Sequence, residues 1–374
     1  MSKLWRKRYS NKTHQTLILS RYDKPLMVVI LILSLFGLLA VFNASVVSAF
    51  RDFGDPYYFI KNQSVFLFLG IGLALVVSRF NYHRLYKLAI PLLFITLILL
   101  LAVFIPGIGI HVLGAKRWVN LGFFSVQPTE IAKLTLVIYL SAWFAYKEKG
   151  RFLPFLTLLG VLVGLIILQP DLGTAVIITG IALVLYFVSG ASVKHFLFLL
   201  PILLAAIALL AIVAPYRMAR LTTFLHPTSD PLGSSYHIRQ ILIGLGSGGW
   251  FGVGLGKSRQ KYEYLPEANT DSIFAIIAEE IGFIGVIVLL AAFIFVIYRI
   301  FKISRGAPDR FGQLLVSGIG SWFAIQTIIN LASMVALVPL TGVPLPLISY
   351  GRSNLLAILI GFGIVLNVSR YQTH

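Results

Sequence analysis

The stretch LMVVILILSLFGLLAVFNASVVSAF, residues 26–50, contains no charged side chain. A transmembrane helix needs about 20 mostly apolar residues, whereas the apolar part of a signal peptide has about 7–15. This run of about 25 residues is therefore expected to form the first transmembrane helix and to stay in the mature protein.

Apolar runs of similar length recur throughout the chain. Of its 374 residues, 58% are hydrophobic and 12% are charged, and the mean hydropathy is +0.90. A soluble protein carries roughly twice that charged fraction. The absence of cysteine excludes disulfide bonds and cysteine catalysis. We expect an all-α polytopic membrane protein with about ten transmembrane helices, at residues 26–50, 63–80, 87–105, 127–146, 152–168, 173–189, 194–214, 272–299, 311–336 and 353–369.

The cations indicate how these helices are oriented. The segment before residue 26 is rich in lysine and arginine, and connections such as YKEKGR and YRIFKISRGAPDR are also basic. Cytoplasmic segments carry such an excess. Residues 1–25 and 370–374 are therefore expected to be cytoplasmic, and residues 26–369 to form a single transmembrane domain. The net charge is +18, but no basic module stands apart from the spans, so nucleic acid is not an expected partner.

Residues 215–271 are expected to form a large extracytoplasmic loop between the seventh and eighth spans. Loops longer than about 15 residues are usually functional or disordered. This one mixes apolar, aromatic and glycine residues, so we expect an ordered lid on the membrane. Its stretch GLGSGGWFGVGLG, residues 244–256, has the G-x-G-x-x-G spacing without a βαβ context. We interpret it as a re-entrant or interfacial segment.

Asp271 ends this loop and directly precedes the apolar run SIFAII. Aspartate favours helix N-caps, and a carboxylate beside cations at a lipid–water boundary can also act as a general base. Glu279 and Glu280 lie about two turns further into the span, where ionisable groups are expected to be functional. The residues alone leave the cap and the base open as roles for Asp271.

Further polar residues sit near the predicted span ends. Glu130 and Lys133 share one helix face, where they either pair with each other or line a polar cavity. Asp171, in QPDLGTA, is either a helix cap or a site residue, and His237 is either structural or a hydrogen-bond donor. An anionic phosphate or pyrophosphate substrate would explain the cations expected outside, which are Arg117, Arg217, Arg220, Arg239, Lys257, Arg259 and Lys261.

The stretch LVPLTGVPLPLISYGRSN, residues 337–354, places prolines at membrane depth together with Ser349 and Ser353. Broken backbone at that depth is tolerated where it lines a cavity. These two serines are therefore counted among the candidate site residues.

Taken in order, the motifs resemble the SEDS family (shape, elongation, division and sporulation), which includes the RodA and FtsW proteins of bacterial wall synthesis. The matching stretches are AKRWVNLGFFSVQPTEIAKL, QPDLGTA, YLPEANTD and VPLTGVPLPLISYGRSNLL, and the resemblance covers essentially the whole chain after residue 20. The stretches GDPYYFIKNQ and LAVFIPGIG resemble the division branch, FtsW, more than RodA. One departure is SYGRSN where the family usually has SYGGSS, so Arg352 and Asn354 replace a glycine and a serine.

The resemblance implies a ten-helix peptidoglycan glycosyltransferase that polymerises lipid II, an undecaprenyl-pyrophosphoryl disaccharide-pentapeptide. It implies that Asp271 is the essential acid, acting as the general base, and that Glu263 lies where activity is regulated. Basic residues, or a divalent cation such as Mg²⁺ or Mn²⁺, then stabilise the leaving pyrophosphate. The candidate substrate-binding residues are Arg117, Glu130, Lys133, Asp171, His237, Gln240, Lys257, Arg259, Lys261, Ser349 and Ser353.

The resemblance also implies partners and a location. The expected partners are a class B penicillin-binding protein, which is a transpeptidase, and regulatory membrane proteins of the division machinery. The expected location is the inner membrane of a bacterium, at the division septum, with the active site facing outside. Two alternatives stay open: a lipid II flippase that uses the intramembrane charges as a polar path, and a non-catalytic division scaffold.

Overall fold

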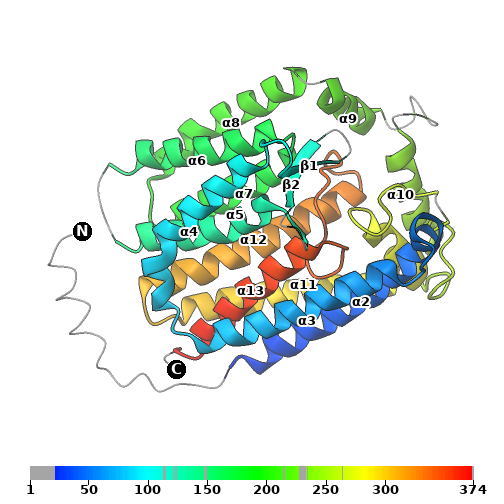
Figure 1. Ribbon diagram of the computed structural model, residues 1–374, viewed down its shortest axis with the longest axis horizontal. Helices are drawn as coiled ribbons and strands as arrows, with labels where there is room; N and C mark the ends of the chain where they lie inside the picture. The colour runs from blue at the N-terminus through cyan, green and yellow to red at the C-terminus, as the bar shows by residue number, and fades with distance from the viewer. Residues whose placement is uncertain are drawn as a thin grey trace.

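The computed structural model describes residues 22–112, 115–120, 122, 124–146, 150–213, 215–226, 233, 235–262 and 264–372. The long helices run roughly along one axis (Figure 1). The beginning of α2 and the end of α13 lie at the same end of this bundle, which we call the terminal end. The opposite end, where α9 and α10 lie, is called the loop end.

Within the described residues, each of the ten predicted spans coincides with a helix, so the predicted helical membrane fold is confirmed. Six of these helices are long and apolar enough to cross a membrane, and α6 and α7 are shorter apolar helices. The helices are α2 (Lys24–Phe53), α3 (Tyr58–Arg79), α4 (His83–Ala102), α5 (Pro128–Phe144), α6 (Phe152–Leu168), α7 (Leu172–Val188), α8 (Val193–Val213), α11 (Ile273–Arg305), α12 (Arg310–Met334) and α13 (Arg352–Ser369).

The helix ends follow from local chemistry. The Asp23 carboxylate accepts the N–H of Leu26 at 3.0 Å, and Asp309 accepts the N–H of Gly312 at 2.8 Å, which starts α2 and α12. The helix α5 begins at Pro128, a residue that has no N–H to leave unpaired in the first turn.

The core lies around α12 and α13. In their most apolar stretches 72% and 83% of residues are buried, against 17% in both α3 and α4. Outward side chains such as Phe68 on α3 are exposed, as expected where a helix faces lipid. Close helix contact is possible where side chains are small: a Cβ at Gly363 of α13 would lie 2.6 Å from the carbonyl oxygen of Ala74 on α3.

A small antiparallel sheet at the loop end was not predicted. It consists of β1 (Gly109–Val112), β2 (Ala115–Asn120) and β3 (Ser125–Val126), in that order, between α4 and α5. Gly109 pairs with Val119, and Val119 also pairs with Val126 on the other side. The Arg117 side chain of β2 donates to the carbonyl of Gln169 in the turn before α7.

The long loop between α8 and α11 contains two helices, α9 (Pro215–Leu225) and α10 (Tyr236–Ser247). Both lie at the loop end (Figure 1). The helix α11 that follows is interrupted at Gly282, whose φ of 66° and ψ of −173° are not helical. Only glycine adopts such a conformation without strain.

Candidate functional site

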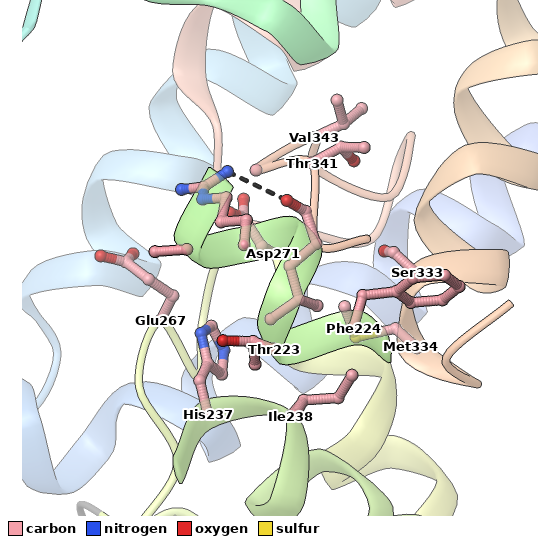
Figure 2. A pocket seen from close by; sticks show the side chains of 14 residues that line it. Thr223, Phe224, His237, Ile238, Glu267, Asp271, Ser333, Met334, Thr341 and Val343 are labelled. Atoms are coloured by element: carbon pink, nitrogen blue, oxygen red, sulfur yellow. Dashed lines mark hydrogen bonds between the residues drawn. The ribbon is translucent and has the colours of Figure 1, made fainter. Parts of the chain in front are cut away.

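A cavity of about 260 Å³ opens at the loop end. Its walls come from α9, α10, the end of α12 and the two segments that precede α11 and α13 (Figure 2). Its lining residues include Arg220, Thr223, Phe224, His237, Ile238, Glu267, Asp271, Ser333, Met334, Thr341, Gly342 and Val343.

Asp271 lies in the wall of this cavity, two residues before α11 begins at Ile273. Ser272 occupies the N-cap position of that helix, so Asp271 does not take the capping role. Asn330 of α12 donates to the main-chain oxygen of Asp271 at 2.9 Å and fixes this part of the chain. Among the described residues, no donor hydrogen-bonds to the Asp271 carboxylate. Asp271 lines the cavity, where a ligand can reach its side chain.

Burial raises the pKa of Asp271 to about 7, since a carboxylate is less stable away from water. The charge of Glu267 raises this pKa further, Arg220 and Arg117 lower it, and Asp171 raises it by a smaller amount. Such a group is about half ionised at neutral pH, which is the range in which a carboxylate works as a general base.

Arg220 and His237 are two further polar residues of the cavity wall. The Arg220 guanidinium donates to the Leu340 carbonyl at 3.0 Å, which holds a cation near the acid (Figure 2). The Nε2 atom of His237 lies 2.8 Å from the Ser272 hydroxyl, and burial lowers the pKa of His237, so its imidazole is neutral at pH 7. The side chain of Arg217 lies outside the described part of the chain.

Gly342 allows the backbone to pass close to the acid. Its φ is +72°, and an added Cβ would lie 3.4 Å from Oδ2 of Asp271. The neighbouring Thr341 packs on the start of α7, where a Cβ at Gly173 would lie 2.6 Å from the Thr341 oxygen. Glycine is therefore required at both places for this wall to form.

Arg117 and Asp171 support the cavity from behind. The Arg117 guanidinium donates to the carbonyl of Gln169 at 3.3 Å and to that of Pro170. Asp171 caps α7, because its carboxylate accepts the N–H of Thr174 at 3.1 Å and the hydroxyl of Thr174 at 2.8 Å. Neither residue lines the cavity, and both affect the acid through their charge.

Glu130 and Lys133 form a buried ion pair of 2.8 Å within the bundle. Lys133 also donates to Gln326 at 2.9 Å and lies 5.2 Å from the ring centre of Trp322. Asn354, one of the departures from the family pattern, donates to Glu130 at 2.7 Å. Of the two interpretations, pairing is the one the structure shows, and neither residue lines the cavity.

The two candidate serines have structural contacts. The Ser349 hydroxyl accepts the N–H of Leu345 at 2.8 Å, and the Ser353 hydroxyl accepts the N–H of Gln127 at 3.1 Å at the start of α5. Neither serine lines the cavity. Their hydroxyls instead satisfy main-chain N–H groups at membrane depth.

Arg352, the other departure, points toward the sheet. It donates to the Ser125 hydroxyl of β3 at 3.0 Å, and its guanidinium lies 5.7 Å from the ring centre of Phe66. It therefore joins α13 to the sheet and to α3, and it does not line the cavity.

The remaining predicted residues lie away from the cavity. Gln240 is half-buried on α10, and Lys257 and Arg259 are exposed. Lys261 is buried in a separate polar cluster, described below. Glu263 lies outside the described residues.

Two residues of the site were not singled out from the sequence. Glu267 lies in the YLPEANTD stretch, four residues before Asp271. An acidic side chain so close to the predicted base could have indicated a site residue. Asn330 is fully buried within the apolar stretch TIINLASM, where a polar side chain is expected to be functional.

These features define a polytopic α-helical membrane protein with a half-buried acid of raised pKa in a cavity at one end of its bundle. The family model for FtsW, RodA and SpoVE, described as "Cell cycle protein", matches residues 24–374, and the chain belongs to this family. The family inferred from the sequence motifs is thereby confirmed.

Several known proteins are similar over nearly the full length. "Probable peptidoglycan glycosyltransferase FtsW" of Trichlorobacter lovleyi is 40% identical over 358 residues, which are 94% of this chain and 94% of that protein. "Stage V sporulation protein E" of Bacillus subtilis is 40% identical over 94% of this chain and 98% of its own.

Solved structures agree with the fold. A chain from work on "Structural coordination of polymerization and crosslinking by a peptidoglycan synthase complex" has a TM-score of 0.78 and 31% identity, and the match covers 94% of this chain and 99% of that chain. The Rod shape determining protein RodA of Thermus thermophilus has a TM-score of 0.70 and 30% identity, with 94% of this chain and 98% of that chain covered.

Proposed function

We propose that this protein is a peptidoglycan glycosyltransferase that polymerises lipid II into glycan strands, with Asp271 as the general base. The observation that carries the proposal is the Asp271 carboxylate, which lies in a cavity with no donor bound to it among the described residues and with a pKa of about 7. The names of the relatives support the reaction class.

In the reaction, a hydroxyl of the acceptor sugar attacks the anomeric carbon of the donor sugar. The bond between that carbon and the lipid pyrophosphate breaks, and the hydroxyl proton passes to the Asp271 carboxylate. Proton removal of this kind contributes about 10²–10⁴-fold to a rate. The cavity of about 260 Å³ is smaller than most small-molecule sites of about 300–1,000 Å³, so we infer that it receives only the reacting sugar.

The charge of the departing pyrophosphate needs cations. Arg220 lines the cavity and is the cation nearest to this role, while Arg117 is held by main-chain carbonyls behind the wall. In the described part of the chain, no three His, Asp or Glu side chains are grouped so that they could hold a metal ion. We propose that the arginines stabilise the charge of the pyrophosphate.

We propose a role for each of the other candidate residues according to its position. His237 lines the cavity and can donate to the substrate, whereas Lys257 and Arg259 are exposed on the loop, where they can attract an anionic lipid. Gln240, Ser349 and Ser353 are proposed to support the walls, and Glu263 is proposed as the regulatory residue.

We propose that the loop end faces outside and that residues 1–25 and 370–374 are cytoplasmic, with residues 26–369 as one transmembrane domain. Cations at the terminal end, such as Arg79, Arg84, Arg305 and Arg310, support this orientation. The proposed location is the bacterial inner membrane at the division septum.

A transpeptidase partner is also proposed. One similar chain comes from a peptidoglycan synthase complex that combines polymerization with crosslinking. We infer that this protein likewise works with a class B penicillin-binding protein, and with regulatory membrane proteins of the division machinery.

A lipid II flippase is less well supported. Glu130 and Lys133 are closed off by their own ion pair, and Glu279 and Glu280 accept hydrogen bonds from the loop, so in the described chain these charges do not line a path between the two ends. A non-catalytic scaffold would not need an acid of raised pKa in the wall of a cavity.

The test is polymerisation of labelled lipid II by the purified protein with its transpeptidase partner. Asp271→Asn is expected to abolish polymerisation while the protein stays folded and still binds lipid II. Asp55→Asn is the matched control, because it makes the same change at an exposed aspartate that pairs with Lys61. Polymerisation at the normal rate by Asp271→Asn would remove the base. Leaflet exchange of lipid II in vesicles that stops in Glu130→Gln would favour the flippase.

A further inference from the structure

A second polar cluster lies beside the start of α11 and is not used by the proposed reaction. It consists of Asn43, Ser258, Lys261, Glu279 and Glu280, and we call it the clasp. Glu279, Glu280, Lys261 and Ser258 expose only 2%, 4%, 7% and 0% of their surface. Charges buried to this degree require partners, and each of these has them.

Glu279 binds the loop through one carboxylate. It accepts the Ser258 hydroxyl, the N–H of Arg259 at 3.3 Å and the N–H of Gln260 at 3.5 Å. Three consecutive loop residues therefore point their donors at a single side chain of α11.

Glu280 extends the cluster to α2. Its carboxylate accepts the N–H of Ser258 at 3.2 Å and the side-chain amide of Asn43. The Asn43 oxygen in turn accepts from the ammonium of Lys261 at 3.1 Å, and Lys261 also donates to the carbonyl of Gly256. Asn43 is thus the link between the first helix and the loop.

The interruption of α11 at Gly282 strengthens this attachment. It leaves the main-chain oxygens of Glu279 and Glu280 free of their helical partners, and they accept the N–H groups of Val253 at 3.0 Å and Gly254 at 3.1 Å. A Cβ at Gly252 would lie 2.1 Å from the Glu280 oxygen, so the glycines of this stretch let the loop pack directly on the interruption.

Hydrogen bonds join the described residues between the clasp and Asp271 to one another and to the segment before α13. The N–H of Leu265 donates to the Gln260 carbonyl and the N–H of Ser272 to the Glu267 carbonyl, both at 3.2 Å. The Asn269 carbonyl accepts the N–H of Tyr350 at 2.9 Å. A displacement at the clasp is therefore transmitted along hydrogen-bonded turns to the acid.

We propose that the clasp is a positioning device for Asp271, in which Asn43 couples α2, through Lys261 and Glu280, to the loop that holds the base in its cavity. This inference rests on the proposed function. Outer residues that hold a catalytic group in place commonly affect activity about 10–100-fold without touching the substrate.

The expected consequence is a change in the pH profile. A loosened loop admits water to Asp271, and lower burial brings its pKa down from about 7 toward the ordinary 3.8. The charged and titratable groups that face Asp271 are Glu267 on the same loop, and Arg220, Arg117, Asp171 and His237 on other elements. The acidic limb of the rate profile then moves to lower pH while kcat falls, because the base is more ionised but less well placed.

The test reverses the polarity of one contact. In Glu280→Gln one acceptor oxygen becomes an NH₂ group, so the Ser258 N–H and the Asn43 amide are left with a single acceptor between them. In Asn43→Asp two carboxylates face each other. The double variant Asn43→Asp/Glu280→Gln restores one donor and one acceptor, and keeps an acceptor for Lys261. We expect each single variant to lower kcat about tenfold and to shift the acidic limb by about one pH unit. The double variant is expected to recover most of both losses.

Ser48→Ala is the matched control, because the Ser48 hydroxyl bonds only to the Ser45 carbonyl within α2 among the contacts described. Thermal unfolding of every variant shows that it is folded. If wild type polymerises lipid II and Asp271→Asn does not, but the single variants keep the wild-type limb and kcat, the clasp has no positioning role and the proposed function stands. The inference is also overturned if the single variants lower kcat without moving the acidic limb of the pH–rate profile, and the double variant does not recover kcat. Failure of wild type itself to polymerise overturns both.

Discussion

The substitution Asp271→Asn is expected to stabilise the protein, and by more at high pH than at low pH. The folded protein holds Asp271 with a pKa of about 7, whereas the same group has a pKa of 3.8 when it is exposed in the unfolded chain. Because the folded pKa is the higher one, the unfolded chain ionises more easily, and the carboxylate opposes folding as the pH rises from 3.8 to 7. The amide cannot ionise, so the variant avoids this cost.

The size of the effect follows from the two pKa values. In wild type, the Asp271 carboxylate lowers the free energy of unfolding by about 4 kcal/mol at pH 8. At pH 5 the loss is about 2 kcal/mol, because the unfolded chain is ionised there while the folded protein is still protonated. The gain of Asp271→Asn in unfolding free energy is thus expected to grow by about 2–3 kcal/mol between pH 5 and pH 8. Thermal unfolding of the detergent-solubilised protein at both pH values measures it.

Asp55→Asn serves as the reference, since Asp55 is exposed and its pKa is lowered by its hydrogen bond to Lys61. This variant is expected to show no gain at either pH. If Asp271→Asn is equally stable to wild type at both pH values, or less stable at pH 8, then the carboxylate is not held away from water and the argument for a base tuned to neutral pH fails. A gain in stability together with loss of polymerisation is the signature of an active-site acid.

In wild type, kcat/KM for polymerisation is expected to rise with pH and level off above about 7, as Asp271 ionises. Gly342→Ala is expected to lower kcat about tenfold in the same assay, because its φ of +72° disfavours a side chain and the strained backbone shifts the wall beside Asp271. Glu130→Gln is expected to cost about 3–5 kcal/mol of stability by leaving Lys133 buried without its ion partner, which thermal unfolding will show. Arg352→Gly is expected to change polymerisation little, because its guanidinium is bound at the sheet.

The sequence was sufficient for the spans because a run of about 20 apolar residues has few other stable conformations. It did not predict the sheet, since GIHV and AKRWVN are short and do not alternate cleanly between apolar and polar residues. The three-residue spacing of Glu130 and Lys133 indicated an ion pair as one of two possibilities, and the structure contains that pair. The clasp partners of Glu279 and Glu280 were not visible, because most are main-chain N–H groups of a loop whose path depends on the tertiary fold.

The sequence also could not show which cations line the cavity, because their contacts depend on the tertiary fold. Arg117 and Arg220 are both basic residues expected at the loop end, and nothing in their neighbours along the chain distinguishes them. The carbonyls that bind Arg117 belong to the turn before α7, so only the folded protein shows that this guanidinium is already occupied. Arg220 instead lies in the cavity wall, to which α9 and the end of α12 both contribute residues.

The buried charges of the bundle bind one another or main-chain groups, and in this way they hold the elements around the cavity in place. A charge at membrane depth costs several kcal/mol unless it is paired, and removing one partner of such a pair is more costly than never having had the pair. Glu130 with Lys133, and the two glutamates of the clasp, each bind several helices or a loop into one arrangement, so small displacements at the loop end are opposed. Asp271 differs from them because, in the described chain, no donor is bound to its carboxylate. Under the proposed function, the hydroxyl of the acceptor sugar is the donor that binds to this carboxylate.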